Sequence, residues 1–112
     1  MVWENGNKYV GQWKDGQRTG QGKFTYKSGA RYEGAFVNGK FHGTGTYYWA
    51  DGTKYTGQWK ESQRTGTGTM WHTNGDRYEG QWKDGKRHGQ GTYFYASGGQ
   101  NAGQWSEGKF VG

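Results

Sequence analysis

Aromatic and glycine residues alternate with mostly polar residues over short stretches of this chain. In Tyr9-Val10-Gly11-Gln12-Trp13-Lys14, every second residue is a ring or a glycine. A period of two is typical of a β-strand with two different faces. Asp15-Gly16 follows, and a second stretch from about Gly20 to Tyr26 again places rings and glycines on one face. Because Asp-Gly favours tight turns between strands, these residues predict a β-hairpin.

The same pattern recurs every 23 residues. Six columns are in register: Tyr9, Tyr32, Tyr55 and Tyr78; Gly11, Gly34, Gly57, Gly80 and Gly103; Trp13, Phe36, Trp59, Trp82 and Trp105; Gly20, Gly43, Gly66, Gly89 and Gly112; Gly22, Gly45, Gly68 and Gly91; Gly29, Gly52, Gly75 and Gly98. A fixed period of this length is typical of supersecondary units that stack on their neighbours. The sequence therefore predicts an all-β array of repeated hairpins.

One array is expected to span residues 1–112. Full repeats cover 9–31, 32–54, 55–77 and 78–100, with a half repeat at 1–8 and a partial repeat at 101–112. We expect nine or ten antiparallel strands in a single-layer, elongated, curved meander. Since neighbouring strands lie about 4.8 Å apart, the ribbon should be about 40 Å long.

Glycine within a strand costs roughly 0.5–1 kcal/mol relative to alanine, so its recurrence needs a reason. A return turn centred on Gly29 predicts a register in which large rings face glycines or other rings; the expected pairs are Tyr26–Tyr32, Phe24–Gly34 and Gly22–Phe36. Each glycine would let a cross-strand ring lie flat over bare backbone. We expect the sheet to curve toward this face and form an aromatic-lined trough.

Composition indicates that rings replace an aliphatic core. The chain has no Leu and no Ile, whereas Trp, Tyr and Phe make up 19% of it. Each ring can bury about 150–250 Å². Proline is absent, so nothing obstructs strand pairing. Cysteine is also absent, which excludes a disulfide framework, thiolate metal sites and a cysteine nucleophile. This fits a reducing compartment, and we expect a cytoplasmic protein.

The unit Y-x-G-x-W-x-x-G-x-x-x-G-x-G resembles the MORN (membrane occupation and recognition nexus) repeat. The matching residues of the first unit recur in steps of 23 over nearly the whole chain: Tyr9, Gly11, Trp13, Gly16, Gly20 and Gly22. The resemblance implies a curved antiparallel meander with roles in protein interaction, scaffold assembly, dimerisation and anionic phospholipid binding. Choline-binding wall repeats, which cage quaternary ammonium between rings, are an alternative. The 23-residue period and the Y-x-G-x-W order fit them less well.

Three positions depart from the repeat. Ser62 replaces the turn glycine, Phe36 replaces tryptophan, and Asn101 replaces the leading tyrosine of the last unit. Ser62 predicts a turn that accepts negative φ or changes its type. Asn101, together with Gly98-Gly99, predicts a looser last hairpin or a boundary.

Candidate chemistry is sparse. His42 and His88 occupy one column two repeats apart, about 19 Å by strand spacing, so they cannot share a metal within one chain. His72 replaces a ring in the column that otherwise holds Tyr26, Trp49 and Tyr95. No serine lies in a nucleophile motif, and no H-E-x-x-H occurs. We predict no catalytic, cofactor-binding or metal-binding residue and therefore no enzyme.

One column breaks the alternation of rings and polar residues. Tyr48, Trp71 and Phe94, with Thr25 in the first unit, should point away from the trough and form an exposed stripe. Exposed apolar patches often mark contact sites, but these rings could also pack within the sheet. The candidate partner-binding rings are Tyr26, Tyr48, Trp49, Trp71, Phe94 and Tyr95.

Basic residues also form columns, and the net charge is +6. The basic residues before each repeat tyrosine should face away from the trough: Lys8, Arg31, Lys54 and Arg77. A second basic set should lie in the hairpin loops: Arg18, Arg64 and Arg87. The polar face should be a cationic ladder with steps of about 10 Å. Such a ladder serves solubility and edge protection or binds an anionic surface. We do not expect nucleic acid binding, because no recognition module is present.

The sequence leaves two candidate functions. The first is a non-catalytic scaffold that binds a protein partner, or a second copy as a homodimer, through the aromatic trough and stripe. The alternative is peripheral binding of an anionic phospholipid membrane through the basic columns, which would weaken as salt rises.

Overall fold

The structure is a computed structural model that describes residues 6–112, so most of the half repeat expected at 1–8 lies outside the described residues. The strands are β1 (Lys8–Lys14), β2 (Gln17–Thr25), β3 (Arg31–Val37), β4 (Lys40–Tyr48), β5 (Lys54–Lys60), β6 (Gln63–Trp71), β7 (Arg77–Lys83), β8 (Lys86–Phe94), β9 (Gln100–Ser106) and β10 (Lys109–Phe110).

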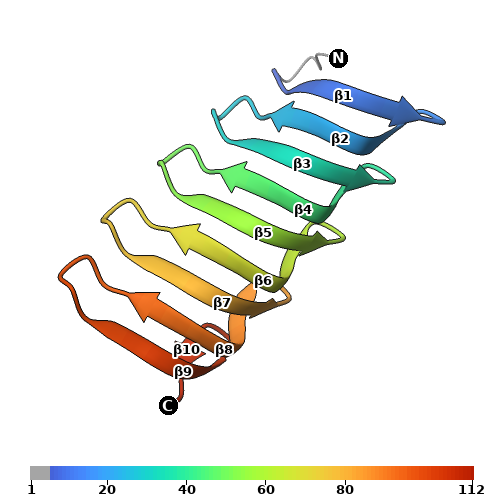
Figure 1. Ribbon diagram of the computed structural model, residues 1–112. Helices are drawn as coiled ribbons and strands as arrows, with labels where there is room; N and C mark the ends of the chain where they lie inside the picture. Colours follow the sequence, from blue (N-terminus) through green and yellow to red (C-terminus); the bar gives the residue numbers. More distant parts are fainter. Residues whose placement is uncertain (1–5) are drawn as a thin grey trace.

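All ten strands belong to one open sheet whose order follows the chain, from β1 to β10. Each strand pairs antiparallel with the next (Figure 1). The molecule extends 46 × 24 × 17 Å, and its long axis crosses the strands. The expected all-β meander is confirmed. The described residues contain no helix long and apolar enough to cross a membrane.

The tight turns between paired strands have positive φ at both central residues. Asp15, Asn38, Glu61, Asp84 and Glu107 have φ of 49–52°, and the residue after each is also left-handed. This is the backbone of a type I′ hairpin turn, which matches the right-handed twist of the strands.

The turn at Ser62 differs from our expectation. Its φ is +67°, so the turn keeps its type although glycine is missing. The Ser62 amide donates to the Phe41 carbonyl at 2.9 Å, and the Ser62 hydroxyl accepts from the Phe41 amide at 3.2 Å. The turn glycines of other hairpins make the same amide bond, so the hydroxyl hydrogen bond is the added contact. It offsets part of the roughly 1–2 kcal/mol that a left-handed conformation costs a residue with a Cβ.

The predicted register between repeats was wrong by two residues. Rings pair with rings and glycines with glycines, as in Phe24↔Tyr32, Gly22↔Gly34 and Gly20↔Phe36. The return turn is the cause. It is closed by a hydrogen bond from the Tyr26 amide to the Ala30 carbonyl at 2.8 Å, so its centre is one residue earlier than predicted.

Glycines do provide room for rings, but these rings are the repeat tyrosines and not the predicted Phe24 and Phe36. The Tyr55 ring runs along its own strand and covers the Gly57–Gly68 pair, and its hydroxyl donates to the Gln58 carbonyl at 3.1 Å. A Cβ built on Gly68 would lie 2.5 Å from Cζ of Tyr55. One built on Gly57 would lie 2.5 Å from Cα of Gly68. The two strands and the ring therefore approach too closely for any side chain.

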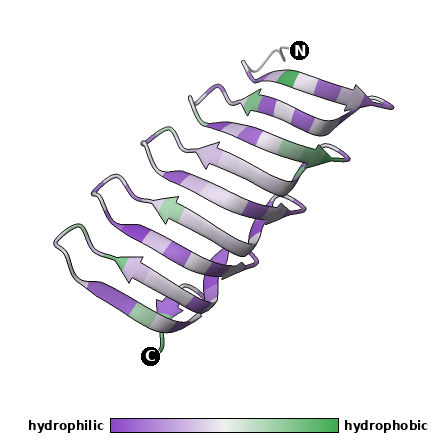
Figure 2. Ribbon diagram, in the orientation of Figure 1, coloured by the Kyte–Doolittle hydropathy of each residue, from purple (hydrophilic) through white to green (hydrophobic). Residues whose placement is uncertain are grey.

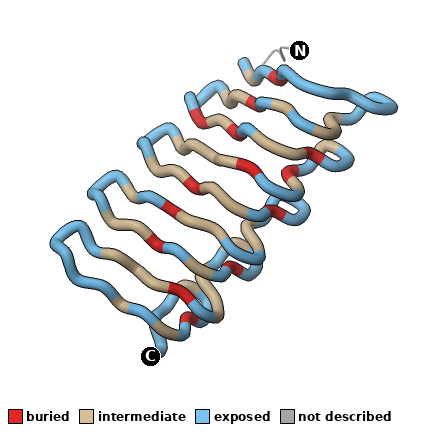
Figure 3. The backbone as a smooth tube through the Cα atoms, in the orientation of Figure 1, coloured by how far each residue is buried: buried red, intermediate tan, exposed pale blue. Residues whose placement is uncertain are grey.

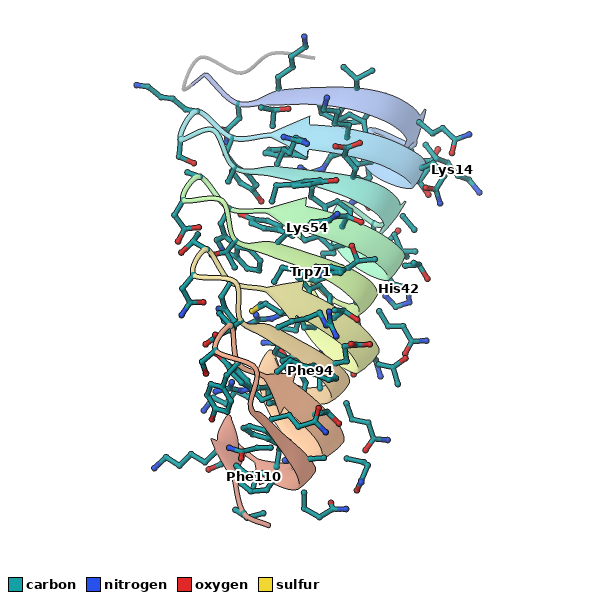
Figure 4. The ribbon with its side chains drawn as sticks, turned by 60° about the vertical axis from the view of Figure 1, so that its left-hand side comes forward. Lys14, His42, Lys54, Trp71, Phe94 and Phe110 are labelled. Carbon is teal, nitrogen blue, oxygen red and sulfur yellow. The ribbon has the colours of Figure 1, made fainter. Side chains whose placement is uncertain are left out.

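A bulge bends each hairpin toward the aromatic face. In β6, Nη1 of Arg64 lies 3.8 Å from Sδ of Met70, although a straight strand would separate their Cα atoms by about 20 Å. Gly66 takes φ +59° at the bend, and the Gln58 side chain accepts from the Thr67 amide there at 2.8 Å. The curved hairpin ends are visible in Figure 4. The aromatic face is therefore concave, as expected.

The core is a continuous chain of rings on this concave face. Tyr55 contacts Trp59 of its own strand and Trp82 of the next repeat, each edge to face at 5.2 Å. Trp59 donates from Nε1 to the Gly45 carbonyl at 3.1 Å and so links two hairpins. Buried positions recur across the strands (Figure 3), although few residues rank as strongly hydrophobic (Figure 2). Rings thus take the place of aliphatic side chains.

The last hairpin is shorter than the others, since β10 has two residues and forms two pairs with β9. The turn and the pairing that lead into it are regular, so the sheet continues through Asn101. Asn101 pairs with Tyr93 in the ladder. The preceding turn is closed by the Tyr95 amide, which donates to the Gly99 carbonyl at 2.8 Å, as in the earlier return turns. The Asn101 side-chain amide donates to the Tyr95 hydroxyl at 2.9 Å.

Candidate binding surfaces

On the convex face, the predicted aromatic stripe and the first basic column are one feature. Their residues are successive partners across the strands, and we call this set the outer ladder: Lys8, Thr25, Arg31, Tyr48, Lys54, Trp71, Arg77 and Phe94. Figure 4 shows Lys54, Trp71 and Phe94 following one another along the ribbon. Cations and rings therefore alternate from strand to strand.

The cations of the outer ladder cover its rings. The Arg31 guanidinium lies 3.8 Å from the centre of the Tyr48 ring, and that of Arg77 lies 4.3 Å from Phe94. The Lys54 ammonium lies 5.0 Å from Trp71. Each such contact contributes about 0.5–1 kcal/mol at an exposed site. The rings therefore pack within the sheet, yet Trp71 remains 37% exposed.

Carboxylates neutralise part of this face. Arg31 pairs with Glu33 and Arg77 with Glu79, each at 2.8 Å. In the repeat between them, the corresponding position is Thr56, whose hydroxyl bonds that of Thr46 at 3.0 Å. The outer ladder is thus less cationic than the sequence columns suggested.

The second basic column does not lie in exposed loops, and this prediction was wrong. Arg18, Arg64 and Arg87 lie in β2, β6 and β8 and turn onto the concave face. Their guanidinium groups donate to the turn carbonyls of the next hairpin, at Gly39, Gly85 and Gly108, at 2.7, 2.5 and 2.6 Å. The bend causes this placement, because it brings the start of each strand back over the rings.

The Arg64 guanidinium lies among rings. It is 4.8 Å from the centre of Trp82 and 5.7 Å from that of Trp49. Burial lowers the pKa of Arg64 from its ordinary value. Arg87 has the same arrangement in the next hairpin, where its guanidinium lies 5.0 Å from the centre of a Trp105 ring.

A cavity of about 690 Å³ opens at the middle of the trough. We call it the central cavity; its aromatic walls are Tyr26, Phe41, Tyr47, Trp49 and Trp59. Phe41 occupies the column that holds arginine in three other repeats. Its ring stacks on that of Tyr32, with the ring centres 3.8 Å apart and the ring planes 6° from parallel, and does not reach toward the next turn. Space remains there for another group.

A second cavity of about 220 Å³ adjoins it, and Arg64 lines both. We call it the arginine cavity; its lining is Arg64, Met70, His72, Trp82, Gly85, Lys86, Arg87 and Gly108. This lining includes the basic residues Arg64, Lys86 and Arg87 and no carboxylate. The cavity therefore combines positive charge with an apolar floor.

The six candidate partner-binding rings fall on two faces. Tyr48, Trp71 and Phe94 belong to the outer ladder, whereas Tyr26 and Trp49 line the central cavity. Tyr95, also on the concave side, packs on Tyr93 at 4.8 Å and is 41% exposed. They therefore do not form one site.

Sequence reasoning missed Phe41 and Tyr47 as walls of the central cavity. The signal for Phe41 was present, since a ring interrupts a column of arginines. The ring predicts a cavity wall only if that column faces the trough, which the sequence alone does not show.

His72 lies in an aromatic setting, as predicted from its column. Its ring centre is 5.8 Å from that of Tyr93. Burial, with a further contribution from Arg87, lowers the pKa of His72 below its ordinary value, although Asp76 opposes this. No cluster of three or more potential metal ligands occurs among the residues that the structure describes.

We expect acid to destabilise the protein through His72. Because the folded-state pKa of His72 is below the unfolded value of about 6.5, the unfolded state binds the proton more readily. The stabilisation from neutral His72 is complete above that unfolded value and is lost as pH falls below it. His72→Tyr, which copies Tyr26 and Tyr95, should remove this loss. Urea unfolding of both proteins between about pH 7.5 and pH 5 measures it, and parallel curves would contradict it.

Comparison with known proteins connects this geometry to a family. The model of the MORN repeat matches residues 9–31, 32–54, 55–77, 78–100 and 102–112. Among characterised proteins, Alsin from rat and Alsin from human are each 49% identical to this chain over 37 residues. The matched segment is 33% of this chain and 2% of Alsin, so the chain spans only a small part of these relatives.

Proposed function

This chain belongs to the MORN repeat family, and on that premise we propose that it is a non-catalytic binding module that holds a protein partner against its aromatic surfaces. The observation that carries the proposal is the central cavity, an opening of about 690 Å³ on the concave face. Its five rings share the lining with polar and charged side chains that include Arg64, Asp84 and Lys86. Tyrosine and tryptophan are favoured anchors of protein interfaces. The outer ladder, with Trp71 37% exposed, offers a second surface on the opposite face.

The titratable groups support a non-catalytic role. The raised pKa values belong mainly to tyrosines that pack in the repeats, and burial is the first cause in each: Tyr26, Tyr55 and Tyr93 are raised to about 12. Their phenols serve packing and hydrogen bonds to neighbouring residues. The histidines do not meet in one place: His72 lines the arginine cavity, whereas His42 and His88 lie in β4 and β8.

The proposal is tested with peptides selected from a random display library by the intact chain. We expect enrichment of binding peptides, and a loss of affinity of about tenfold or more on Trp49→Ala or on Trp71→Ala. Val10→Ala, at a 58% exposed position, is the control and should change little. Fluorescence anisotropy measures each Kd. Failure to enrich peptides, or equal binding by all variants, would overturn the proposal.

The partner could be a second copy of the chain, which light scattering over a range of concentrations tests. A molecular mass that stays at one chain at the highest concentration removes self-association while leaving binding of another protein intact. A cytoplasmic location fits either partner and is part of the proposal.

Binding to an anionic membrane is the alternative, supported by the net charge of +6. The geometry gives it less support, because Glu33 and Glu79 neutralise two cations of the outer ladder and Arg64 and Arg87 turn into the trough. Co-sedimentation with anionic vesicles that weakens with salt would favour it, since surface charges are screened beyond about 8–10 Å at moderate salt.

A further inference from the structure

We propose that the trough recognises an extended segment of its partner in which an apolar side chain and an acidic side chain are three residues apart. The apolar side chain fills the central cavity, and the carboxylate binds in the arginine cavity. This inference rests on the proposed function and specifies the partner.

The apolar subsite arises from a paired exchange in the repeat. Elsewhere, an arginine donates to the carbonyl of a turn glycine in the next hairpin, as Arg64 does to Gly85 at 2.5 Å. Between the second and third repeats, Phe41 replaces the arginine and Ser62 replaces the glycine, and the two are joined by backbone and hydroxyl hydrogen bonds. The space that a guanidinium would occupy is open and faces Trp49 and Trp59.

The carboxylate subsite follows from the cations of the arginine cavity. Each guanidinium has five N–H donors. In the described part of the chain, Arg64 donates to one carbonyl and weakly to Sδ of Met70, and Arg87 donates to one carbonyl. Neither forms an ion pair with a described carboxylate. A carboxylate placed between them would accept charge-assisted hydrogen bonds.

The spacing follows from the sheet. The two cavities adjoin through Arg64, and equivalent positions in successive hairpins are two strands, or about 10 Å, apart. An extended peptide rises about 3.3 Å per residue, so three residues cover that distance. A segment lying along the trough would therefore bring an apolar residue and an acidic residue three positions away into the two cavities together.

A peptide fits this site better than a lipid headgroup. Both cavities open on the concave face, between curved hairpins, where a flat bilayer cannot follow the surface. The lining of the arginine cavity also includes the apolar side chains of Met70 and Trp82, which suit the methylene groups of aspartate or glutamate.

Two double variants test the subsites with residue pairs that the chain already uses. Phe41→Arg with Ser62→Gly restores the common repeat pair and should fill the central cavity. Arg64→Phe with Gly85→Ser copies the Phe41 and Ser62 pair and removes one cation from the arginine cavity. Circular dichroism and thermal unfolding establish that each variant retains the fold before binding is measured.

The experiment uses nine-residue peptides selected from a random library by the wild-type chain. We expect enrichment of an apolar residue and an Asp or Glu three positions apart. Replacing that acid with its amide should weaken binding to the wild type about tenfold and have little effect on Arg64→Phe/Gly85→Ser. Phe41→Arg/Ser62→Gly should weaken binding by a similar factor.

Other outcomes separate the two proposals. Peptides that depend on Trp49 or Trp71, yet lack the spaced pair and bind both double variants normally, would overturn this inference and leave the proposed function standing. Failure to select any peptide would overturn both. Displacement of a selected peptide by phosphatidylserine vesicles, but not by neutral vesicles, would show that the arginines of the arginine cavity bind lipid headgroups. That result would also overturn the inference.

Discussion

Replacing Gly68 with alanine should destabilise the protein by about 3 kcal/mol or more and lower its Tm by about 10 °C or more. The new Cβ would lie 2.5 Å from Cζ of Tyr55 and 2.6 Å from its Cε1. That ring is fully buried and its hydroxyl is bonded to the Gln58 carbonyl, so it cannot move aside cheaply. Urea unfolding followed by tryptophan fluorescence and by circular dichroism measures the change.

Gly99→Ala is the matched control. A Cβ there would meet only Cδ2 of Tyr95 at 3.9 Å, and the residue is exposed, so the unfolding free energy should change by less than about 1 kcal/mol. Tyr55→Leu combined with Gly68→Ala should cost less than the sum of the single changes, because the ring that blocks the Cβ is gone. A Gly68→Ala protein as stable as Gly99→Ala would disprove close packing of the ring on the glycine.

Alkaline unfolding should be unusually steep. Burial raises the pKa of Tyr26 and Tyr55 to about 12, and burial together with Asp76 raises that of Tyr93 to about 12. Because these folded-state values exceed the unfolded value of about 10, the unfolded state loses the protons first. The stabilisation is complete below about pH 10 and is lost as pH rises toward 12. Each of the three phenols therefore adds to the loss of unfolding free energy in that window.

Tyr55→Phe isolates one phenol. The variant loses the hydrogen bond to the Gln58 carbonyl and should be less stable than the wild type at neutral pH. Its unfolding free energy should then fall less steeply with pH above about 10. Urea titrations at several pH values, with tyrosinate absorbance as a second signal, measure both slopes. Equal slopes would show that Tyr55 ionises in the folded state as readily as in the unfolded chain.

The hairpins could be predicted because their signals are local. Asp15-Gly16 and Asn38-Gly39 specify a turn type on their own, and both residues of each have positive φ. The alternation from Tyr9 to Lys14 likewise needs no tertiary information. The register between hairpins was missed because the return turn includes Ala30, whose carbonyl accepts a hydrogen bond from the Tyr26 amide. An alanine in the sequence does not indicate that its carbonyl closes a turn.

The site was harder to predict because it depends on curvature. A straight strand would leave Arg64 at a hairpin end, far from the rings. The bend at Gly66 brings it within 3.8 Å of Met70. A mid-strand glycine with φ near +60° cannot be recognised from sequence among so many glycines. The meaning of Phe41 in the arginine column depended on that bend.

The contacts between successive hairpins have an evolutionary consequence. Trp59, Trp82 and Trp105 each donate to the carbonyl of the glycine 14 residues earlier, at 3.0–3.1 Å. The same contact therefore recurs in three repeats, whereas Phe36 takes the tryptophan position in the second repeat and has no indole donor. A gene that duplicates or deletes one 23-residue unit changes the length of the ribbon by about 10 Å without requiring a new set of packing contacts. A paired change such as that of Phe41 and Ser62 then alters the surface of one repeat, so length and recognition can evolve separately.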